Sequence, residues 1–412
     1  MRKREAGPDR RGDDETDPTQ FDDRGGKSSA SASTTPTYAG PVEWSREQAR
    51  AIDKALDWLD DRNGDQEFRM LGAAGTGKST VAVEIGKQAG NVAFCALSGK
   101  AASRLVERGV ERDRCSTIHS LIYYTHYDED RNRYVFTTKN RSELSHLDLI
   151  VVDEASMVGS RVARDLRSFG RPLLNVGDDF QLPPPTGEGD TAPLLAGRAD
   201  VHLRTIHRQA LGNPILAVAD AIRRNKDWHR FVDDDRVRVV DFLRVEDAAG
   251  YDAVICGTNN RRRAINRKMR EHLGYDGAVP HVGEVLICLR NDYEVNTYNG
   301  ETFEVIKVHR RRDCPAVDLE LSNLQYPAKA SVTVPLSFFE DGEPPERRTV
   351  PHPWQCFDFA YGMTCHKAQA SEWDSVAVVD ESRVFRDMAR RWFYTACTRA
   401  RKRLTIVRKG VR

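Results

Sequence analysis

Short apolar runs alternate with amphipathic helical stretches along most of this chain. A helix is expected to start after Ser45, its N-cap, and to run to about Asp61. Strands separated by helices are typical of α/β units with parallel sheets. The pattern therefore predicts an α/β fold with two series of strands, the first at 68–71, 92–96, 149–152 and 173–176 and the second at 254–256, 375–379 and 404–407.

Two segments interrupt this alternation. Residues 123–146 have the pattern of a strand, a polar turn and a second strand, which predicts a β-hairpin. Between Val282 and Val350, four consecutive strands are expected, with Asn299-Gly300 and Asp341-Gly342 as turn signals. The second segment therefore predicts a small β-barrel inserted into the second α/β unit, with strands at 285–289, 302–308, 316–321 and 331–334.

Composition narrows the class of protein. The first 40 or so residues are charged and then rich in Gly, Ser and Thr, so they bury too little apolar surface to offset the entropy of ordering. The 63 basic and 62 acidic residues nearly cancel, so net charge does not indicate a nucleic-acid partner. The eight cysteines form no C-x-x-C pair, and no apolar run is long enough to span a bilayer. We therefore expect a soluble protein of the cytoplasm with no membrane partner and a disordered tail at 1–40.

The stretch LGAAGTGKST at 71–80 contains the phosphate-binding signature G-x-x-x-x-G-K-[ST]. Its glycines let backbone N–H groups close around a polyphosphate at a helix N-terminus. Lys78 is expected to reach the β- and γ-phosphates, and Ser79 to bind Mg²⁺. A plain glycine-rich turn is the alternative, but an apolar run, 81–85, follows as the motif requires. The predicted nucleotide-binding residues of the loop are Gly72, Ala73, Ala74, Gly75, Thr76, Gly77, Lys78, Ser79 and Thr80.

An apolar strand at 149–152 ends in Asp153 and Glu154. In a P-loop ATPase such a strand delivers an acid to Mg²⁺ beside the β- and γ-phosphates. Asp153 is therefore a predicted metal ligand with Ser79, and Glu154 the base that orients and deprotonates the attacking water. Gln181, in the loop after the next strand, could sense the γ-phosphate through a hydrogen bond, although such glutamines are usually ordinary surface residues.

Charge that spreads over the γ-phosphoryl oxygens needs cations. Arg208 and Arg399 are candidates, because arginine stays charged and its planar fork matches phosphate geometry. Both lie in the second α/β unit, so they reach the nucleotide only if it is bound between the two units. Such a cleft would close with ATP and open after hydrolysis. The residues alone therefore predict a two-lobed motor ATPase that uses ATP and Mg²⁺.

Taken in chain order, these blocks resemble the motifs of superfamily 1 DNA helicases, in the RecD/Dda-like branch that moves 5′→3′. Gln48 matches the adenine-reading glutamine of that family, and Arg208 and Arg399 match its fourth-motif arginine and its arginine finger. The resemblance spans roughly residues 44–408. The other matching blocks are 72–79, 96–102, 116–121, 153–156, 177–184, 363–369 and 394–399.

The resemblance implies two RecA-like P-loop lobes with two insertions. The N-terminal lobe is expected at 41–122 and 147–200, and the C-terminal lobe at 201–280 and 351–412. The hairpin at 123–146 would be the strand-separating pin, and the strands at 281–350 an SH3-like β insertion. This organisation refines the two α/β units and two interruptions predicted from the apolar pattern.

The resemblance also implies an ATP-dependent helicase that binds single-stranded and forked DNA. Tracks for single strands combine phosphate contacts with base stacking. For the two histidines a satisfied structural role is the alternative, and for the phenylalanine a packed surface aromatic. The DNA-contact positions it implies are Ser98, Lys100, Thr117, His119, Phe136, Thr364, His366 and Lys367.

The chain departs from the family pattern at a few positions, and alternatives stay open. Leu97 and Ser98 replace a proline and a threonine, and Ala370 replaces a glycine; if that glycine takes positive φ, alanine costs stability or shifts the loop. One alternative is a DNA-stimulated remodelling ATPase, or a recombination-complex subunit, that does not separate strands on its own. A P-loop kinase is another, but it leaves the two arginines unexplained. Replication or recombination proteins are candidate partners, and the oligomeric state is open, with a monomer as one option.

Overall fold

The computed structural model describes residues 43–61, 65–128, 130, 133–183, 192–206, 212–292, 294–324, 327–340, 345–369 and 371–412. Trp44–Arg412 form one compact unit. The predicted disordered tail at 1–40, the candidate Arg208 and the substituted position Ala370 lie outside the described residues.

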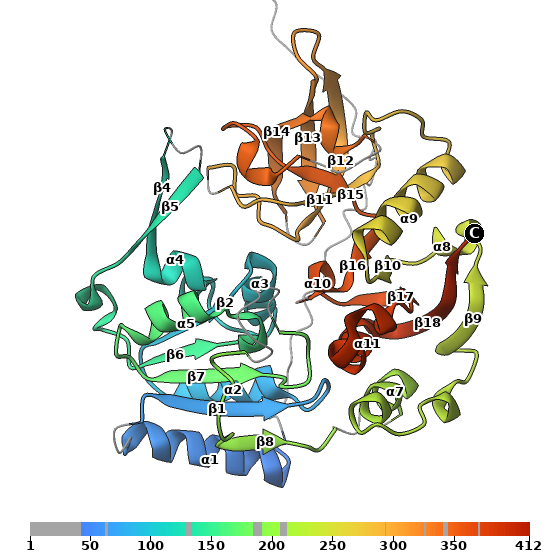
Figure 1. Ribbon diagram of the computed structural model, residues 1–412. Helices are drawn as coiled ribbons and strands as arrows, with labels where there is room; N and C mark the ends of the chain where they lie inside the picture. The colour runs from blue at the N-terminus through green and yellow to red at the C-terminus, as the bar shows by residue number, and fades with distance from the viewer. Residues whose placement is uncertain are drawn as a thin grey trace, which may run out of the picture. The chain divides into compact units, whose positions relative to one another are not determined.

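A six-stranded parallel sheet, in the order β3-β2-β6-β7-β1-β8, occupies the first part of this unit (Figure 1). All of the strands predicted for the first series are present. Two short edge strands, β3 and β8, were not predicted, because three residues give too little periodicity to detect. The strands are β1 (Glu67–Gly72), β2 (Val92–Ala96), β3 (Cys115–Thr117), β6 (Leu149–Val152), β7 (Leu173–Gly177) and β8 (Val201–Leu203).

Helices cover both faces of this sheet. The apolar side chains of α1 (Arg46–Asp60), α2 (Lys78–Gln88) and α3 (Gly99–Glu107) pack on one face, and those of α4 (Ile118–Ile122) and α5 (Ser160–Arg167) on the other. The predicted helix start is confirmed, because the Ser45 side chain accepts a hydrogen bond from Gln48 N and Gln48 Oε1 accepts one from Ser45 N.

A second parallel sheet has five strands in the order β16-β10-β17-β18-β9. Its strands are β9 (Val237–Leu243), β10 (Ala253–Cys256), β16 (Gly362–Thr364), β17 (Trp373–Val379) and β18 (Ala400–Val411). Apolar side chains of α7 (Pro214–Arg223) and α11 (Ala389–Cys397) pack on one face, and those of α8 (Val245–Ala248) and α9 (Asn259–His272) on the other. The short α10 (Cys365–Ala368) follows β16. The predicted α/β class, with parallel sheets flanked by helices, is confirmed.

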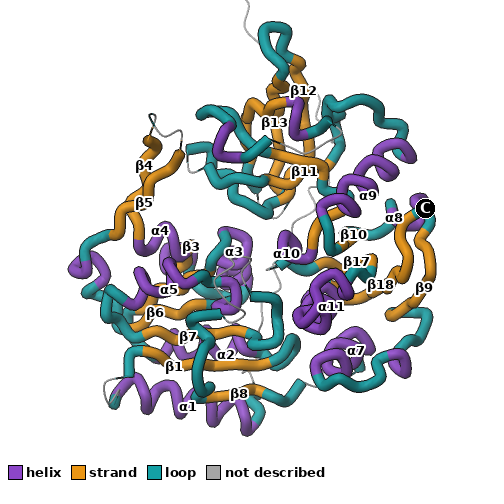
Figure 2. The backbone as a smooth tube through the Cα atoms, viewed as in Figure 1, coloured by secondary structure: helices purple, strands orange, loops and turns teal. Residues whose placement is uncertain are grey.

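Two antiparallel elements interrupt these units, as Figure 2 shows. A hairpin of β4 (Tyr123–Asp128) and β5 (Arg133–Thr138) follows α4. The second element is a five-stranded sheet ordered β14-β13-β12-β11-β15, built from β11 (Val285–Cys288), β12 (Thr302–Arg310), β13 (Ala316–Asn323), β14 (Lys329–Pro335) and β15 (Phe357–Phe359). Two boundaries differ from the predicted ones. β15 belongs to the antiparallel sheet although it lies after the predicted segment 281–350. β8 belongs to the first parallel sheet although the second lobe was expected to begin at residue 201. The identification of the two elements as a pin and an SH3-like insertion stays a prediction. Across the described residues, every helix is too short or too polar to cross a membrane.

Candidate nucleotide cleft and DNA groove

The P-loop connects β1 to α2, and its glycines occupy positions where a side chain would be strained or would clash. Gly75 and Gly77 have φ of 80° and 79°, in the left-handed region that favours glycine. A Cβ atom on Gly72 would lie 2.7 Å from Thr76 Oγ1 and 2.8 Å from Leu203 O, which is too close for any side chain. The predicted phosphate-binding loop therefore forms at the N-terminus of α2, which begins at Lys78.

Several hydrogen bonds fix the shape of this loop. Lys78 Nζ and Thr76 Oγ1 both donate to Ala73 O, each over 2.9 Å. Gln48 Nε2 donates to Thr76 O over 3.4 Å. Gln48 is buried and its amide oxygen is already engaged in the capping box of α1. The predicted adenine-reading residue thus lies directly against the P-loop.

The two predicted acids follow β6. The Asp153 N–H donates to Cys95 O over 2.9 Å, and the Asp153 carboxylate accepts from Glu154 N over 3.0 Å. Burial and the charge of Asp153 raise the pKa of Glu154, whereas the charges of Arg399 and Lys78 act to lower it. The pKa of Glu154 is therefore affected by an acid and a lysine of the first lobe and by an arginine of the second. A raised pKa makes the Glu154 carboxylate a stronger base.

Gln181 and Arg399 are both nearly fully buried, with exposed fractions of 5% and 2%. The Gln181 Oε1 atom has no hydrogen-bond partner among the described residues, which leaves unused bonding capacity in a buried place. The Arg399 guanidinium donates to Thr395 O, Ser371 O and Thr398 Oγ1 over 3.0, 3.2 and 3.1 Å. Its bonds therefore hold it at the C-terminal end of α11.

A hydroxyl and a carboxylate are the predicted Mg²⁺ ligands, Ser79 and Asp153. Mg²⁺ prefers oxygen ligands of this kind and is usually bound by one or two carboxylates together with substrate phosphates. Asp153 is 5% exposed and Ser79 lies in the first turn of α2. The residues present therefore fit this cation.

Sequence reasoning missed the contacts that join the two lobes. Tyr394 OH donates to Asp178 Oδ2 over 2.5 Å, and Leu182 N donates to Thr395 Oγ1 over 3.0 Å. Gln369 Nε2 donates to Leu182 O over 2.7 Å. All of these residues lie inside blocks that the sequence singled out. What the sequence does not give is the pairing of these residues: Tyr394 and Asp178, for example, lie 216 positions apart.

Most of the predicted DNA-contact residues line a single groove of about 270 Å³. It is lined by residues of α3 and α4 in the first lobe, of α10 in the second and of the antiparallel sheet's loop before β12. That loop supplies Tyr298, which sequence reasoning missed, and the turn residues Asn291, Asn299 and Gly300. The predicted residues in the groove are Ser98, Lys100, Thr117, His119, His366 and Lys367.

The two groove lysines differ from ordinary surface lysines. Burial lowers the pKa of Lys100 to about 8 and that of Lys367 to about 8. The Lys100 ammonium lies 5.0 Å from the centre of the Trp373 ring, and Lys367 donates to Asn299 Oδ1. The Lys367 ammonium is therefore held at the groove by Asn299, whereas Trp373, the partner of Lys100, lies outside the groove's lining.

The hydroxyl residues have structural roles as well. Ser98 caps α3 by accepting from Ala101 N over 3.2 Å, and Thr117 caps α4 by accepting from Ser120 N over 3.1 Å. Thr364 precedes α10 and lies outside the groove's lining. Its DNA contact stays a prediction.

Three aromatic rings form a cluster at the base of the hairpin. The His119 and Phe136 rings lie 5.4 Å apart, and each lies within 5.7 Å of the Tyr123 ring. These contacts support the packing alternative for Phe136, and its contact with a DNA fork stays a prediction. Burial lowers the pKa of His119 and of His366, so both imidazoles are neutral at pH 7.

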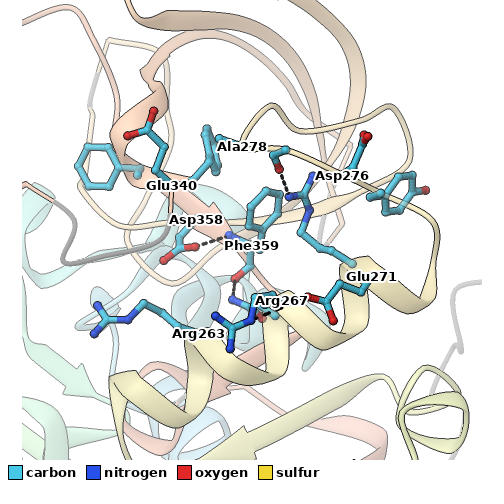
Figure 3. Close-up of a pocket in the computed structure, with 14 residues that line it drawn as sticks. Arg263, Arg267, Glu271, Asp276, Ala278, Glu340, Asp358 and Phe359 are labelled. Atoms are coloured by element: carbon cyan, nitrogen blue, oxygen red, sulfur yellow. Dashed lines mark hydrogen bonds and ion pairs between the residues drawn. The ribbon is translucent and has the colours of Figure 1, made fainter.

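A separate hollow of about 450 Å³ lies between α9 and the antiparallel sheet (Figure 3). Asn266 Nδ2 donates to Phe359 O over 2.8 Å, and Arg267 and Glu271 form an ion pair at 3.9 Å. The buried charge of Asp358 is paired with Arg262. The side chains of this hollow largely satisfy one another, and they differ from the predicted site residues.

The fold and the cleft define a class of protein. A P-loop beside strand-end acids, with a buried arginine from a second parallel α/β unit, defines a two-lobed P-loop NTPase. A family model described as an AAA domain matches residues 43–241, and one described as a UvrD-like helicase C-terminal domain matches residues 359–407.

Two curated relatives and two solved structures agree with these matches. The ATP-dependent RecD2 DNA helicase of Deinococcus radiodurans is 27% identical over 401 residues, covering 87% of this chain and 48% of the relative. The RecBCD enzyme subunit RecD of Mycolicibacterium smegmatis is 27% identical over 405 residues, covering 82% of this chain and 67% of the relative. These matches make the chain similar to RecD-like DNA helicases.

The solved structures show the same fold. Bacteroides Pif1 bound to single-stranded DNA has a TM-score of 0.58 at 18% identity, covering 89% of this chain and 92% of that one. Pif1 helicase from Candida albicans has a TM-score of 0.54 at 17% identity, covering 89% and 94%. The chain spans about half the length of the RecD2 relative.

Proposed function

We propose that this chain is an ATP-dependent DNA helicase that moves 5′→3′ on single-stranded DNA and unwinds duplex. The observation that carries the proposal is the contact between the lobes beside the P-loop, where Tyr394 OH donates to Asp178 Oδ2 over 2.5 Å. The charges of Lys78 in one lobe and Arg399 in the other also act together to lower the pKa of Glu154. A base on which cations of both lobes act is suited to a phosphate that both lobes grip. The RecD2 relative is named as an ATP-dependent DNA helicase, which supports the same activity.

In the proposed mechanism, the P-loop amides and Lys78 hold the β- and γ-phosphates of ATP. Ser79 and Asp153 would hold Mg²⁺, which supplies charge neutralisation at the phosphates when bound. Glu154 accepts the proton of the attacking water. Arg399 balances the charge that develops on the γ-phosphoryl oxygens, after exchanging its bonds at the end of α11 for the phosphate.

The way the groove is built supports the proposed movement on DNA. Ser98, Lys100 and Thr117 belong to the first lobe, whereas His366 and Lys367 belong to the second. A change in the separation of the lobes therefore changes the distance between two sets of contacts on one strand. Loop 177–183, which bonds to Thr395 and to Gln369, lies between the nucleotide site and the second lobe and would transmit that change.

Partners and location belong to the same proposal. Single-stranded and forked DNA are the proposed substrates, and Pif1 structures are described with both. A location in the cytosol or nucleoid, and association with replication or recombination proteins, are further parts of it. Because the M. smegmatis relative is named as a RecBCD subunit, a recombination-complex subunit that does not unwind alone is the second candidate.

A fork assay separates the two candidates. The purified chain is mixed with ATP, Mg²⁺ and duplexes that carry a single-stranded tail on either the 5′ or the 3′ side. We expect ATP hydrolysis stimulated by single-stranded DNA, and strand release from the 5′-tailed duplex only. Stimulated hydrolysis without strand release would favour the subunit, and release from only the 3′-tailed duplex would contradict the proposed polarity.

A further inference from the structure

Tyr394, in the second lobe, reaches across to the P-loop of the first. Its hydroxyl accepts a hydrogen bond from Ala74 N over 3.1 Å and donates one to Asp178 Oδ2 over 2.5 Å. The residue is 1% exposed, and its ring packs edge-on against Phe180 with centroids 5.3 Å apart. One phenol therefore joins α11, the loop after β7 and the phosphate-binding loop.

The peptide unit between Ala73 and Ala74 is held on both sides. Its carbonyl oxygen accepts from Lys78 Nζ and from Thr76 Oγ1, each over 2.9 Å. Its N–H is the group that Tyr394 OH binds. Rotation of this peptide plane would disturb all three bonds together, so the tyrosine hydroxyl constrains the position of the Lys78 ammonium through the peptide.

The hydroxyl is itself held in place. Asp178 is 1% exposed, and its Oδ1 atom accepts from Phe180 N over 3.0 Å and from Arg223 over 3.2 Å. Arg223 also donates to Asp179 over 2.6 Å. Burial and the charge of Asp178 raise the pKa of Tyr394, so the phenol stays protonated and able to donate at neutral pH. The chain of bonds thus runs from α7 through loop 178–180 to the P-loop.

We propose that Tyr394 is a positioning residue for phosphate binding, because its hydroxyl fixes the Ala73–Ala74 peptide from the second lobe. The docking of α11 then sets the shape of the P-loop, and nucleotide affinity depends on the arrangement of the lobes. This inference rests on the proposed ATP-dependent function, but it concerns binding, which is measurable without turnover.

Tyr394→Phe tests the inference, since it removes one oxygen atom and keeps the buried ring. Tyr251→Phe is the matched control, because its hydroxyl bonds to Thr405 Oγ1 over 2.6 Å within the second lobe. Titration of fluorescent ADP with Mg²⁺ should show about three- to tenfold weaker binding for Tyr394→Phe, the range expected for one lost hydrogen bond. The control should stay within about twofold of the original chain, a difference below the worth of one such bond.

Kinetics and a second variant exclude a merely structural effect. The KM for ATP should rise by a factor similar to the loss of affinity, with kcat changed less, because the lost contact acts on the bound ground state. Asp178→Asn removes the charge that orients the phenol and should weaken ADP binding in the same direction. Thermal unfolding of each variant checks that the fold is retained.

Unchanged or tighter ADP binding in folded Tyr394→Phe overturns the inference. If that variant does not fold, unchanged binding in Asp178→Asn overturns it equally. If Tyr394→Phe weakens ADP binding but the original chain never hydrolyses ATP, the helicase proposal fails and this inference stands. If the original chain hydrolyses ATP but Tyr394→Phe binds ADP unchanged, this inference fails and the helicase proposal stands.

Discussion

At the scale of single residues, Glu154 combines an unusual backbone conformation with a perturbed pKa, which suits the base proposed at this position. The residue has φ of 50°, a left-handed conformation that is uncommon outside glycine, directly after a buried strand. That turn places its carboxyl group beside Asp153, and burial adds to the effect of the neighbouring charge in raising its pKa. Backbone strain and a perturbed pKa on one residue are typical of functional sites.

Lys78→Ala should abolish DNA-stimulated ATP hydrolysis while the fold survives. The ammonium is a cation at the proposed phosphate site, and its loss should lower turnover by about 100-fold or more. The measurement is the rate of phosphate release with saturating single-stranded DNA. Lys87→Ala is the control, because Lys87 is an exposed residue at the other end of the same helix. Full turnover in Lys78→Ala would refute the assignment of the P-loop.

At the scale of elements, apolar periodicity predicted the buried strands of both parallel sheets, the hairpin and four of the five strands of the antiparallel sheet. Every predicted strand of both parallel sheets has an apolar run that is buried from end to end or nearly so. The edge strand β9 was missed because its burial is irregular, and β16 because it is three residues long. In the site, the P-loop and the strand-end acids were predictable because their spacing is local. The bond from Ala74 to Tyr394 was not, because no local pattern pairs residues 320 positions apart.

The short helices α3 and α10 each hold a lysine in the groove, which predicts a pH dependence of DNA binding. Burial sets both pKa values at about 8, and a bound phosphate should raise them, so binding takes up protons above that pH. DNA affinity should therefore be highest below about pH 8 and should fall as the pH rises to about 9.5. Fluorescence anisotropy with a labelled oligonucleotide measures this affinity at each pH, with the ionic strength held constant.

The variant Lys100→Arg/Lys367→Arg provides the control for this effect. Arginine stays protonated throughout the range, so the fall in affinity should flatten while binding at about pH 7 persists. Lys307→Arg, at an exposed ion pair with Glu320 on the antiparallel sheet, should keep the original pH profile. A fall of the same steepness in the double variant would remove these lysines from the DNA site.

At the scale of the whole molecule, the proposed coupling between the lobes would run through the residues that bond across them. Loop 177–183 touches α11 through Asp178 and Leu182, and the charge of Arg399 reaches Glu154. These contacts link the loop after β7 in the first lobe to α11 in the second. A substitution in the second lobe can therefore test whether that lobe takes part in ATP hydrolysis.

Arg399→Ala should lower the maximal rate of ATP hydrolysis by about a thousandfold and leave ATP binding nearly intact, because an arginine finger acts mainly on the transition state. Its guanidinium makes buried bonds at the end of α11, so Arg399→Lys serves as a second variant that keeps the charge. It should lose less of the rate. Arg401→Ala, at an exposed ion pair with Asp374 two residues further on, should stay close to the original rate.

Steady-state hydrolysis gives kcat, and nucleotide titration gives affinity and confirms folding. An unchanged kcat in Arg399→Ala would mean that the second lobe supplies no catalytic cation at this position, and the two-lobed motor would then lack its link between hydrolysis and movement.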